Sequence, residues 1–117
     1  PYEAINAVNL IGDQYKDPTN CWYGIYKGIL GFMVNTEELE RLGLEAPKTW
    51  EDLADPKYKG EIIMASPAIS GTQYAILNGT IQAYGEEKGW EVWKGINENV
   101  DFYAQGGGEP GPKCAAG

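Results

Sequence analysis

The chain has 117 residues, of which 43% are hydrophobic and 22% are charged, as expected for one globular domain with its own core. Its 17 acidic and 9 basic residues give a formal net charge of -8, so nucleic acid and acidic membrane surfaces are not expected as partners. The absence of histidine excludes Ser-His-Asp and Cys-His nucleophile systems and most zinc sites.

The two cysteines, Cys21 and Cys114, are too few and too widely spaced for a metal motif. The sequence leaves open whether they form a disulfide or remain two free thiols. No apolar run of about 18 residues is present, so no transmembrane helix is predicted. The chain starts without an initiator Met or a signal peptide and stops within a helical pattern, and we therefore interpret it as a piece of a longer protein.

The first third of the chain combines a weakly helical start with a long apolar stretch. Residues 1–10 have loosely helical apolar spacing. Residues 21–34 mix aromatic and β-branched side chains with three glycines, which predicts a long strand or a bent strand pair inside a sheet. Trp22, Tyr23 and Tyr26 in this stretch could line a ligand pocket, although packing in a core or an interface is the favoured interpretation.

Capping signals predict two short helices in the middle of the chain. Asn35 precedes the segment Thr36–Leu42 and Gly43 follows it, which is the arrangement of an N-cap and a left-handed C-cap. Thr49 caps a shorter helix, Trp50–Ala54, of roughly a turn and a half.

The second half of the chain alternates strands with helices. Short strands are predicted at Glu61–Ala65 and Val100–Ala104, and helices at Gly71–Tyr84 and from Glu86 to about Glu98. A final helix is expected to start at Pro112, whose ring suits the first helical turn. Strands separated by helices indicate an α/β layer structure, and the whole chain is expected to form one domain.

Each of the two long predicted helices has an apolar stripe that should face the core. In the first helix the stripe consists of Tyr74, Leu77, Ile81 and Tyr84. In the second helix it consists of Trp90, Trp93 (or Val92) and Ile96. Tryptophans at such positions are expected to pack in the core rather than to stack on a ligand.

The turn between the strand at Glu61–Ala65 and the helix after it is the strongest candidate binding site. It contains Ser66 and the run Ser70-Gly71-Thr72. Free backbone N–H groups and the positive dipole at a helix N-terminus, together with nearby hydroxyls, can hold a phosphate, a carboxylate or a similar oxyanion. An ordinary serine N-cap is the alternative interpretation, and the residues alone favour it.

A glycine-rich loop, residues 105–112, follows the last predicted strand. It lacks the Gly-Lys-Ser/Thr ending of a P-loop, so nucleotide hydrolysis has no support. Gln105 and Gly106 at its start could close over a ligand, and a simple flexible connector is the alternative. The sequence has no cofactor motif and no metal-binding cluster, so neither a cofactor nor a metal site is expected.

Several short motifs, each weak alone, occur in a fixed order from position 22 onward. They are Trp22-x-Gly24, Leu30-Gly31-Phe32-x-Val34-Asn35, Leu42-Gly43-Leu44-x-x-Pro47-x-Thr49-Trp50-x-Asp52-Leu53, Asp55-Pro56-Lys57-Tyr58-Lys59-Gly60-Glu61-Ile62, Ser66-Pro67-x-x-Ser70-Gly71-Thr72 and Gly89-Trp90. Together they resemble the solute-binding proteins of ABC importers. The subgroup that they resemble is the ferric-iron, phosphonate and sugar-phosphate type, within the type II periplasmic-binding-protein fold.

The resemblance implies a three-layer α/β lobe with a mixed sheet flanked by helices, which would be most of the second lobe of a receptor that closes on its ligand like a hinge. In this family a Ser-Gly-Thr turn lies at the cleft and holds the anionic part of a ligand, or an anion beside a metal. That role transfers to Ser70, Gly71 and Thr72, which match residue for residue, and less tightly to Ser66. The expected ligand-binding set is completed by Trp22, Tyr23, Gln105 and Gly106.

The predicted function is therefore the capture, without catalysis, of an anionic or anion-assisted small solute in the periplasm or on a membrane-anchored lipoprotein. The solute could be ferric iron with an anion, a phosphonate or a sugar phosphate. An ABC permease is the expected partner of the full-length protein, and self-association through the exposed interlobe surface could also occur. The alternative is a non-catalytic structural or interaction domain whose Ser-Gly-Thr turn is only a helix cap.

Overall fold

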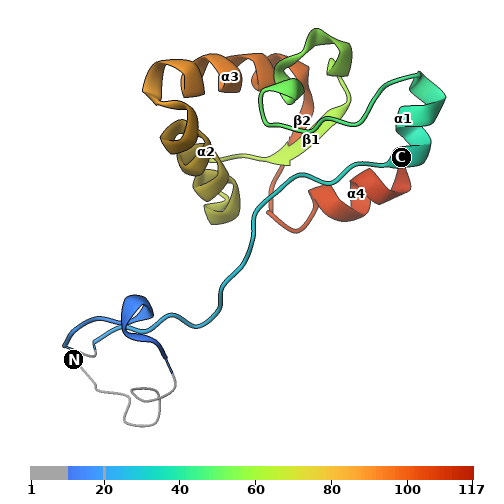
Figure 1. Cartoon of the computed structure of the whole chain (residues 1–117). Helices are drawn as coiled ribbons and strands as arrows, with labels where there is room; N and C mark the ends of the chain where they lie inside the picture. Colours follow the sequence, from blue (N-terminus) through green and yellow to red (C-terminus); the bar gives the residue numbers. More distant parts are fainter. Residues whose placement is uncertain (1–10, 20) are drawn as a thin grey trace.

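The structure is a computed structural model that describes residues 11–19 and 21–117, so the helix predicted within residues 1–10 lies outside the described residues. Within the described residues, two parallel strands and four α-helices form the body of the molecule (Figure 1). This alternation of helices and strands confirms the α/β prediction. None of the described helices is long and apolar enough to cross a membrane.

The sheet and its crossover helices form where the sequence predicts them, to within one residue. Strand β1 (Ile62–Ala65) leads into helix α2 (Gly71–Tyr84), and helix α3 (Glu86–Asn99) leads into strand β2 (Val100–Ala104). The strands pair in parallel, with Ala65 beside Ala104 at their carboxyl ends. Parallel strands need a long crossover connection, and the α2–α3 pair supplies it.

The hydrophobic core lies between the sheet, helix α3 and the short 3-10 helix η2 (Asp52–Ala54). Its buried members are Leu53, Met64, Val92, Trp93 and Ile96. This core contains one buried polar atom without a hydrogen-bond partner. Among the described residues, Nε1 of Trp93 is the only fully buried side-chain nitrogen or oxygen of this kind.

Both predicted apolar stripes are displaced around their helices. Trp90 is 46% exposed, because at about 100° per residue it lies about 120° around the helix from the fully buried Ile96. Tyr74 is 60% exposed, whereas Gln73 and Thr80 on the same helix are buried. The predictions of Trp90 and Tyr74 as core residues are therefore wrong, and the other members of each stripe are buried or half-buried.

Two glycines let helix α3 approach its neighbours closely. A Cβ at Gly89 would lie 2.8 Å from Cα of Ile81 in α2, and a Cβ at Gly95 would lie 2.6 Å from Cβ of Ala54 in η2. Both distances are shorter than van der Waals contact, so a larger residue at either position would push two elements apart.

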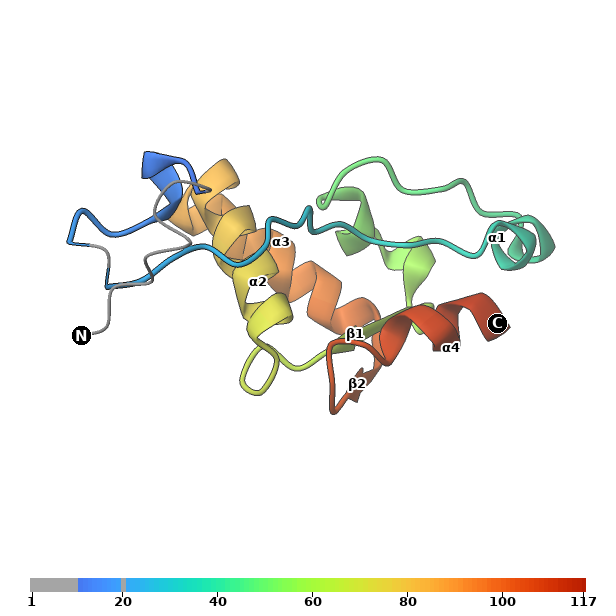
Figure 2. The same ribbon diagram turned by 90° about the horizontal axis from the view of Figure 1, so that it is seen from below.

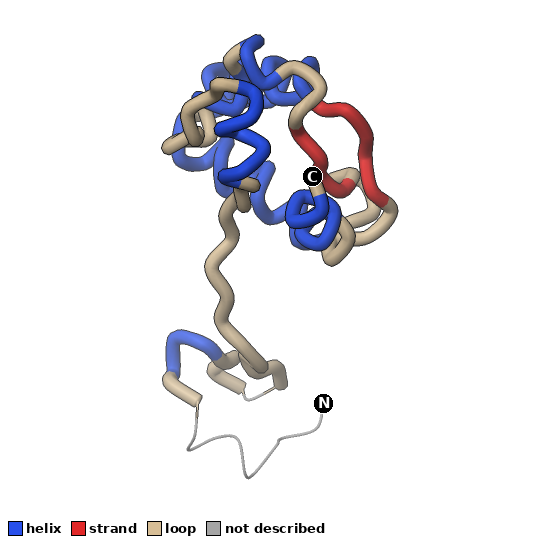
Figure 3. Tube along the Cα trace, turned by 90° about the vertical axis from the view of Figure 1, so that its right-hand side faces the viewer, coloured by secondary structure: helices blue, strands red, loops and turns tan. Residues whose placement is uncertain are grey.

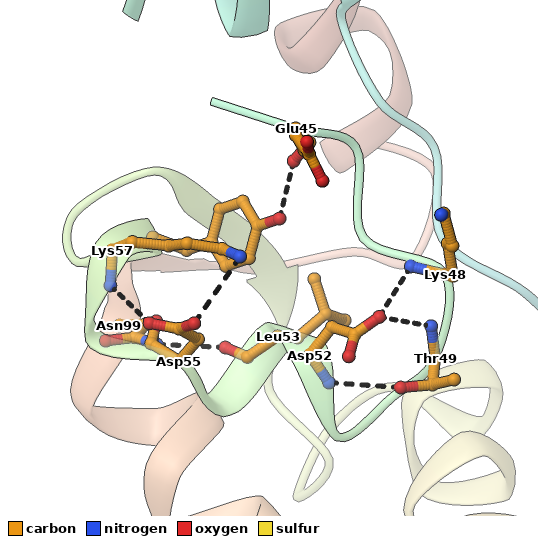
Figure 4. Close-up of polar contacts among 9 residues, drawn as sticks. Glu45, Lys48, Thr49, Asp52, Leu53, Asp55, Lys57 and Asn99 are labelled. Carbon is orange, nitrogen blue, oxygen red and sulfur yellow. Dashed lines mark hydrogen bonds and ion pairs between the residues drawn. The ribbon is translucent and has the colours of Figure 1, made fainter. Parts of the chain in front are cut away.

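Thr49 and Asp52 hydrogen-bond to each other's backbone N–H groups immediately before and at the start of η2 (Figure 4). The Asp52 carboxylate accepts hydrogen bonds from the backbone N–H groups of Lys48 (2.8 Å) and Thr49 (2.9 Å), and the Asp52 N–H donates to the Thr49 hydroxyl (3.2 Å). The predicted helix Trp50–Ala54 is thus reduced to the 3-10 helix Asp52–Ala54, whose N-cap position is Glu51 rather than Thr49, although the Thr49 hydroxyl still accepts from the Asp52 N–H. The two backbone donors, first that of Lys48 and then that of Thr49, hold the pKa of the Asp52 carboxyl below its usual value.

We expect Asp52→Asn to make thermal unfolding less sensitive to acid. Because the folded-state pKa of Asp52 lies below the unfolded value of about 4, its carboxylate stabilises the fold above that pH and loses this contribution as the pH falls through the folded pKa. The variant should therefore melt below the wild type at neutral pH, and the gap should shrink at about pH 3. Melting curves at both pH values measure this, and a gap independent of pH would contradict it.

Asn99, the last residue of α3, ties this helix to the 51–60 segment (Figure 4). Its side chain is buried, and Nδ2 donates hydrogen bonds to the backbone carbonyls of Leu53 (2.9 Å) and Asp55 (2.7 Å). On the other side of the segment, the Tyr58 hydroxyl donates to the Glu45 carbonyl (2.6 Å). The segment is therefore held in place by side chains that satisfy its backbone.

Helices α1 (Thr36–Leu42) and α4 (Pro110–Ala116) lie side by side (Figures 1 and 2). Asn35 caps α1 through its Oδ1, and its Nδ2 donates to the Cys114 carbonyl in α4 (2.9 Å). Gly43 ends α1 at φ 66°, so the predicted helix and both of its caps are confirmed. Helix α4 begins two residues before the predicted Pro112. Its Cys114 is a free thiol, as is Cys21.

The strand predicted for residues 21–34 is wrong. Residues 11–19 and 21–30 belong to an arm that projects away from the body (Figures 1 and 3), and its only sheet-like contact within the described residues is an isolated antiparallel bridge between Lys16 and Tyr23. An extended segment becomes a strand only when another strand pairs with it, and no described strand lies beside this one. Its side chains are exposed as a result: Ile25 is 94% and Ile29 98% accessible.

Candidate functional site

Two loops meet at the carboxyl ends of the parallel strands. Residues 66–70 follow β1 and residues 105–109 follow β2, and Figure 2 shows both loops leaving the same end of the sheet. The Ser66 N–H donates to the Ala104 carbonyl (3.4 Å), which extends the strand pairing by one step into the loops. Ligands of open α/β sheets bind at this edge, so the fold itself marks it as a candidate site.

The turn before α2 is a serine-capped helix N-terminus with free donors. The Ser70 hydroxyl oxygen accepts a hydrogen bond from the Gln73 N–H (3.3 Å), so the predicted cap is confirmed as local structure. The backbone N–H groups of Gly71 and Thr72 have no hydrogen-bond partner within the described part of the chain. These two donors and the hydroxyl hydrogen of Ser70 stand at the positive end of the helix dipole, where an anion is stabilised.

The glycine loop after β2 closes onto this turn. A Cβ at Gly107 would lie 3.0 Å from the Ser70 hydroxyl oxygen and 3.5 Å from that of Thr72. The loop is shaped by Glu109, whose carboxylate accepts from the Gly106 N–H (3.0 Å) and whose own N–H donates to the Gly106 carbonyl (3.2 Å). A side chain at position 107 would crowd the Ser70 hydroxyl, so glycine suits this close approach.

A cavity of ≈ 740 Å³ opens beside the turn. Ser70, Thr72, Gln73 and Gly107 contribute polar groups to it, and the rest of its lining, which is more apolar than polar, comes mainly from residues 31–35, α1, residues 47–65, β2 and α4. The volume falls within the range of small-molecule sites, which combine apolar walls with a few convergent polar groups.

Charged groups around this cavity are already engaged or are acidic. Arg41 pairs with Glu38 at 2.6 Å, and Lys113 lies over the ring of Phe102 at 4.8 Å from its centroid. Asp101 also lines the cavity. The described residues contain no group of three or more His, Cys, Asp or Glu side chains that could hold a metal ion. An anion at the turn would therefore depend on amides and hydroxyls rather than on a cluster of basic side chains.

The predicted site residues are distributed unequally around the cavity. Ser70 and Thr72 line it, and Gly71 lies between them with an exposed backbone. Ser66 does not line the cavity, and its hydroxyl oxygen accepts from the Ala68 N–H (3.3 Å), which stabilises the turn. Ser66 is thus a shaping residue in this structure rather than part of the wall.

The remaining predicted residues lie farther from the wall. Gln105 and Gly106 are in the adjoining loop, where Gly107 rather than either of them lines the cavity. Trp22 and Tyr23 belong to the projecting arm, do not line the cavity, and are not core residues; Trp22 is 57% exposed. The structure adds two residues that the sequence interpretation missed, Gln73 and Gly107. The displaced stripe of α2 is the signal for Gln73, since position 73 shares a helix face with Ile76 and Thr80.

Comparison with known proteins places the chain in a class of proteins, the bacterial extracellular solute-binding proteins. The family model described as bacterial extracellular solute-binding protein matches residues 2–109. The chain belongs to this family.

Individual relatives agree with this assignment. A solved structure of the periplasmic binding protein AfuA from Actinobacillus pleuropneumoniae, with exogenous fructose-6-phosphate bound, matches 71% of this chain and 26% of its own, with 42% identity and a TM-score of 0.67. An uncharacterized protein of Haemophilus influenzae is 39% identical over 122 residues, which cover 100% of this chain. Iron uptake protein A1 of Synechocystis is 29% identical over 96 residues, which cover 82% of this chain and 26% of the relative.

The chain is much shorter than these relatives. It spans 35% of the length of the Haemophilus influenzae protein. The family assignment therefore applies to the chain itself, and the activity of a whole receptor is a matter for proposal.

Proposed function

We propose that this chain is most of one lobe of an extracytoplasmic solute-binding protein and that its Ser70-Gly71-Thr72 turn binds the phosphate group of a small organic solute. The observation that supports this best is the approach of Gly107 to the Ser70 and Thr72 hydroxyls, at the carboxyl ends of two parallel strands. Fructose-6-phosphate, which is bound in the AfuA structure, is a solute of this kind.

The chemistry of the turn suits a phosphate monoester. Such a group has about −1.5 to −2 charges near neutral pH and three strongly accepting oxygens. The N–H groups of Gly71 and Thr72 and the hydroxyls of Ser70 and Thr72 are donors on one side of it, and the N-terminus of α2 adds a favourable dipole. With a net charge of -8 the chain does not attract anions over long range, so recognition is local.

A ferric ion held together with an anion is the second candidate ligand. The similarity to iron uptake protein A1 supports it, and the same turn would then hold the anion beside the metal. Titration with phosphate alone and with ferric iron plus phosphate separates the two candidates. Binding that requires iron would favour the second.

The rest of the proposal concerns the complete receptor. Such a receptor would act in the periplasm or as a membrane-anchored lipoprotein, would pass its solute to an ABC permease, and would perform no catalysis. A single lobe should bind weakly, since closure of two surfaces around the solute supplies most of the affinity. The exposed apolar side chains of the arm support self-association of the isolated chain.

A structural or interaction domain is the alternative from another class. Under this alternative the Ser70 hydroxyl only caps α2. The capping hydrogen bond itself is present under both hypotheses. Ligand titration decides between the two, because a mere cap has no reason to respond to millimolar phosphate.

We expect Gly107→Ala to weaken binding of phosphate and of fructose 6-phosphate by at least about tenfold, the effect of losing one hydrogen bond to a charged group. The new methyl group would lie 3.0 Å from the Ser70 hydroxyl oxygen and must displace it or the loop. Amide chemical shifts followed during titration give the dissociation constants.

Gly108→Ala is the matched control for this experiment. A Cβ at Gly108 meets nothing within 4 Å, and neither glycine has a positive φ, so the two variants differ mainly in the contact with Ser70 and Thr72. Equal binding by both variants and the wild type would contradict the placement of the phosphate beside Gly107.

A further inference from the structure

Gln73 is a buried amide that the fold leaves without a partner. The residue is 8% exposed, and its backbone N–H donates to the Ser70 hydroxyl oxygen. No hydrogen bond of the Gln73 carboxamide is found within the described residues. A carboxamide without a protein partner can pair with water or with a bound molecule.

Gln73 is a wall residue of the cavity, and its amide atoms are not sealed in the core. Gln73 lines the cavity together with Ser70 and Thr72, and Ile76, one turn further along the same face of α2, lines it as well. The only sealed side-chain polar atom without a partner among the described residues is Nε1 of Trp93, so the amide atoms of Gln73 still reach the open volume. The group therefore has access to a bound molecule.

We propose that the Gln73 carboxamide recognises the hydroxylated organic part of the solute whose phosphate group is held at the adjacent turn. This inference rests on the proposed function. An amide offers two donors and one acceptor oxygen and is neutral, which suits sugar or polyol hydroxyls, while the charged group is left to the helix N-terminus. Residue 73 lies within one turn of Ser70, so a phosphate and the hydroxyl next to it can contact both at once.

In this proposal, the phosphate group and the hydroxyl groups of the ligand are recognised by different parts of the site. The Ser70-Gly71-Thr72 turn acts on any phosphate, including the inorganic ion. Gln73 acts only on a ligand that has hydroxyl groups beyond the phosphate, so it sets the preference for the organic ester over the free ion.

Gln73→Leu tests this division of roles, with inorganic phosphate and fructose 6-phosphate as probes. We expect binding of fructose 6-phosphate to weaken about tenfold, as for the loss of one or two neutral hydrogen bonds, and binding of inorganic phosphate to change less than about twofold. Leucine removes an unpaired polar group from a buried position, so the melting temperature should stay equal or rise. A structural role of Gln73 would instead lower the melting temperature.

Thr80→Val is the matched control. Thr80 is buried on the same face of α2, but its hydroxyl donates within the helix to the Ile76 carbonyl (2.8 Å), and it does not line the cavity. This variant should bind both probes as the wild type does. In the wild type, the side-chain NH₂ resonances of Gln73 should shift with fructose 6-phosphate and much less with inorganic phosphate, a readout that needs no folded variant.

The possible results are distinguishable. Equal affinities of Gln73→Leu and wild type for both probes, or an equal loss for both with a lower melting temperature, would overturn the role of Gln73 and leave the proposed function standing. If the wild type binds neither probe, the proposed function itself fails and this role fails with it.

Discussion

Replacing Gly71 with Asp should abolish phosphate binding without harming the fold. A Cβ at Gly71 meets nothing within 4 Å, so the side chain fits, and its carboxylate would stand where the anion is proposed to bind. Two unit charges about 4 Å apart repel by about 4 kcal/mol at the effective dielectric constant of a protein surface. This energy corresponds to roughly a thousandfold loss of affinity. Because a single lobe is expected to bind phosphate weakly, binding by the variant should no longer be detectable.

The stability of the same variant should move in the opposite direction. An acidic side chain in the first turn of a helix is stabilising by about 0.3–1 kcal/mol, so Gly71→Asp should melt at or above the wild-type temperature. Gly71→Asn, the neutral variant of the same size, should keep most of the phosphate binding. Calorimetric titration and melting curves measure both properties. Undiminished phosphate binding by Gly71→Asp would place the anion elsewhere.

Asn99→Asp should destabilise the chain by about 3–5 kcal/mol, the usual effect of an uncompensated buried charge. The Asn99 side chain is 2% exposed and donates to the carbonyls of Leu53 and Asp55. An aspartate has nearly the same shape but turns both donors into acceptors that face carbonyl oxygens. Since a domain is stable by only about 5–15 kcal/mol, urea unfolding should show a large fall in the midpoint.

Asn97→Asp provides the control with the same change of charge on the same helix. Asn97 is exposed, and its Oδ1 accepts from the Tyr103 hydroxyl (2.6 Å), a bond that a carboxylate oxygen can also accept. Its free energy of unfolding should stay within about 0.5 kcal/mol of the wild type. Similar losses in both variants would mean that added charge near the end of α3, and not the buried hydrogen bonds of Asn99, is responsible.

The sequence predicts those parts of the fold whose ends have their own chemistry. Asn35 and Gly43 define α1, Ser70 defines the start of α2, and the apolar runs of β1 and β2 are bounded by turns. Each of these signals is satisfied by hydrogen bonds within a few residues. Local patterns therefore determine where elements begin and end almost independently of the rest of the molecule.

The predictions that fail depend on partners distant in sequence. Residues 21–34 have the composition of a strand, but strand formation requires a neighbour, and none is present among the described residues. Likewise, nothing near Gly107 in the sequence indicates that its backbone approaches Ser70 and Thr72. Gln73 was missed because a polar residue on a helix is expected to be exposed, whereas tertiary packing turns its face inward.

The parallel register of β1 and β2 also determines when the candidate site can form during folding. Ile62 pairs with Val100, so the whole segment that contains α2 and α3 must return across the sheet for the strands to meet. Contacts between residues so distant in sequence require a large loss of chain entropy before they are made, which makes them slow. The two loops that surround the turn are continuations of these strands. We therefore expect their meeting to be a late event in folding, so an incompletely folded chain would have the helix N-terminus at Ser70 but not yet the Gly107 loop against it.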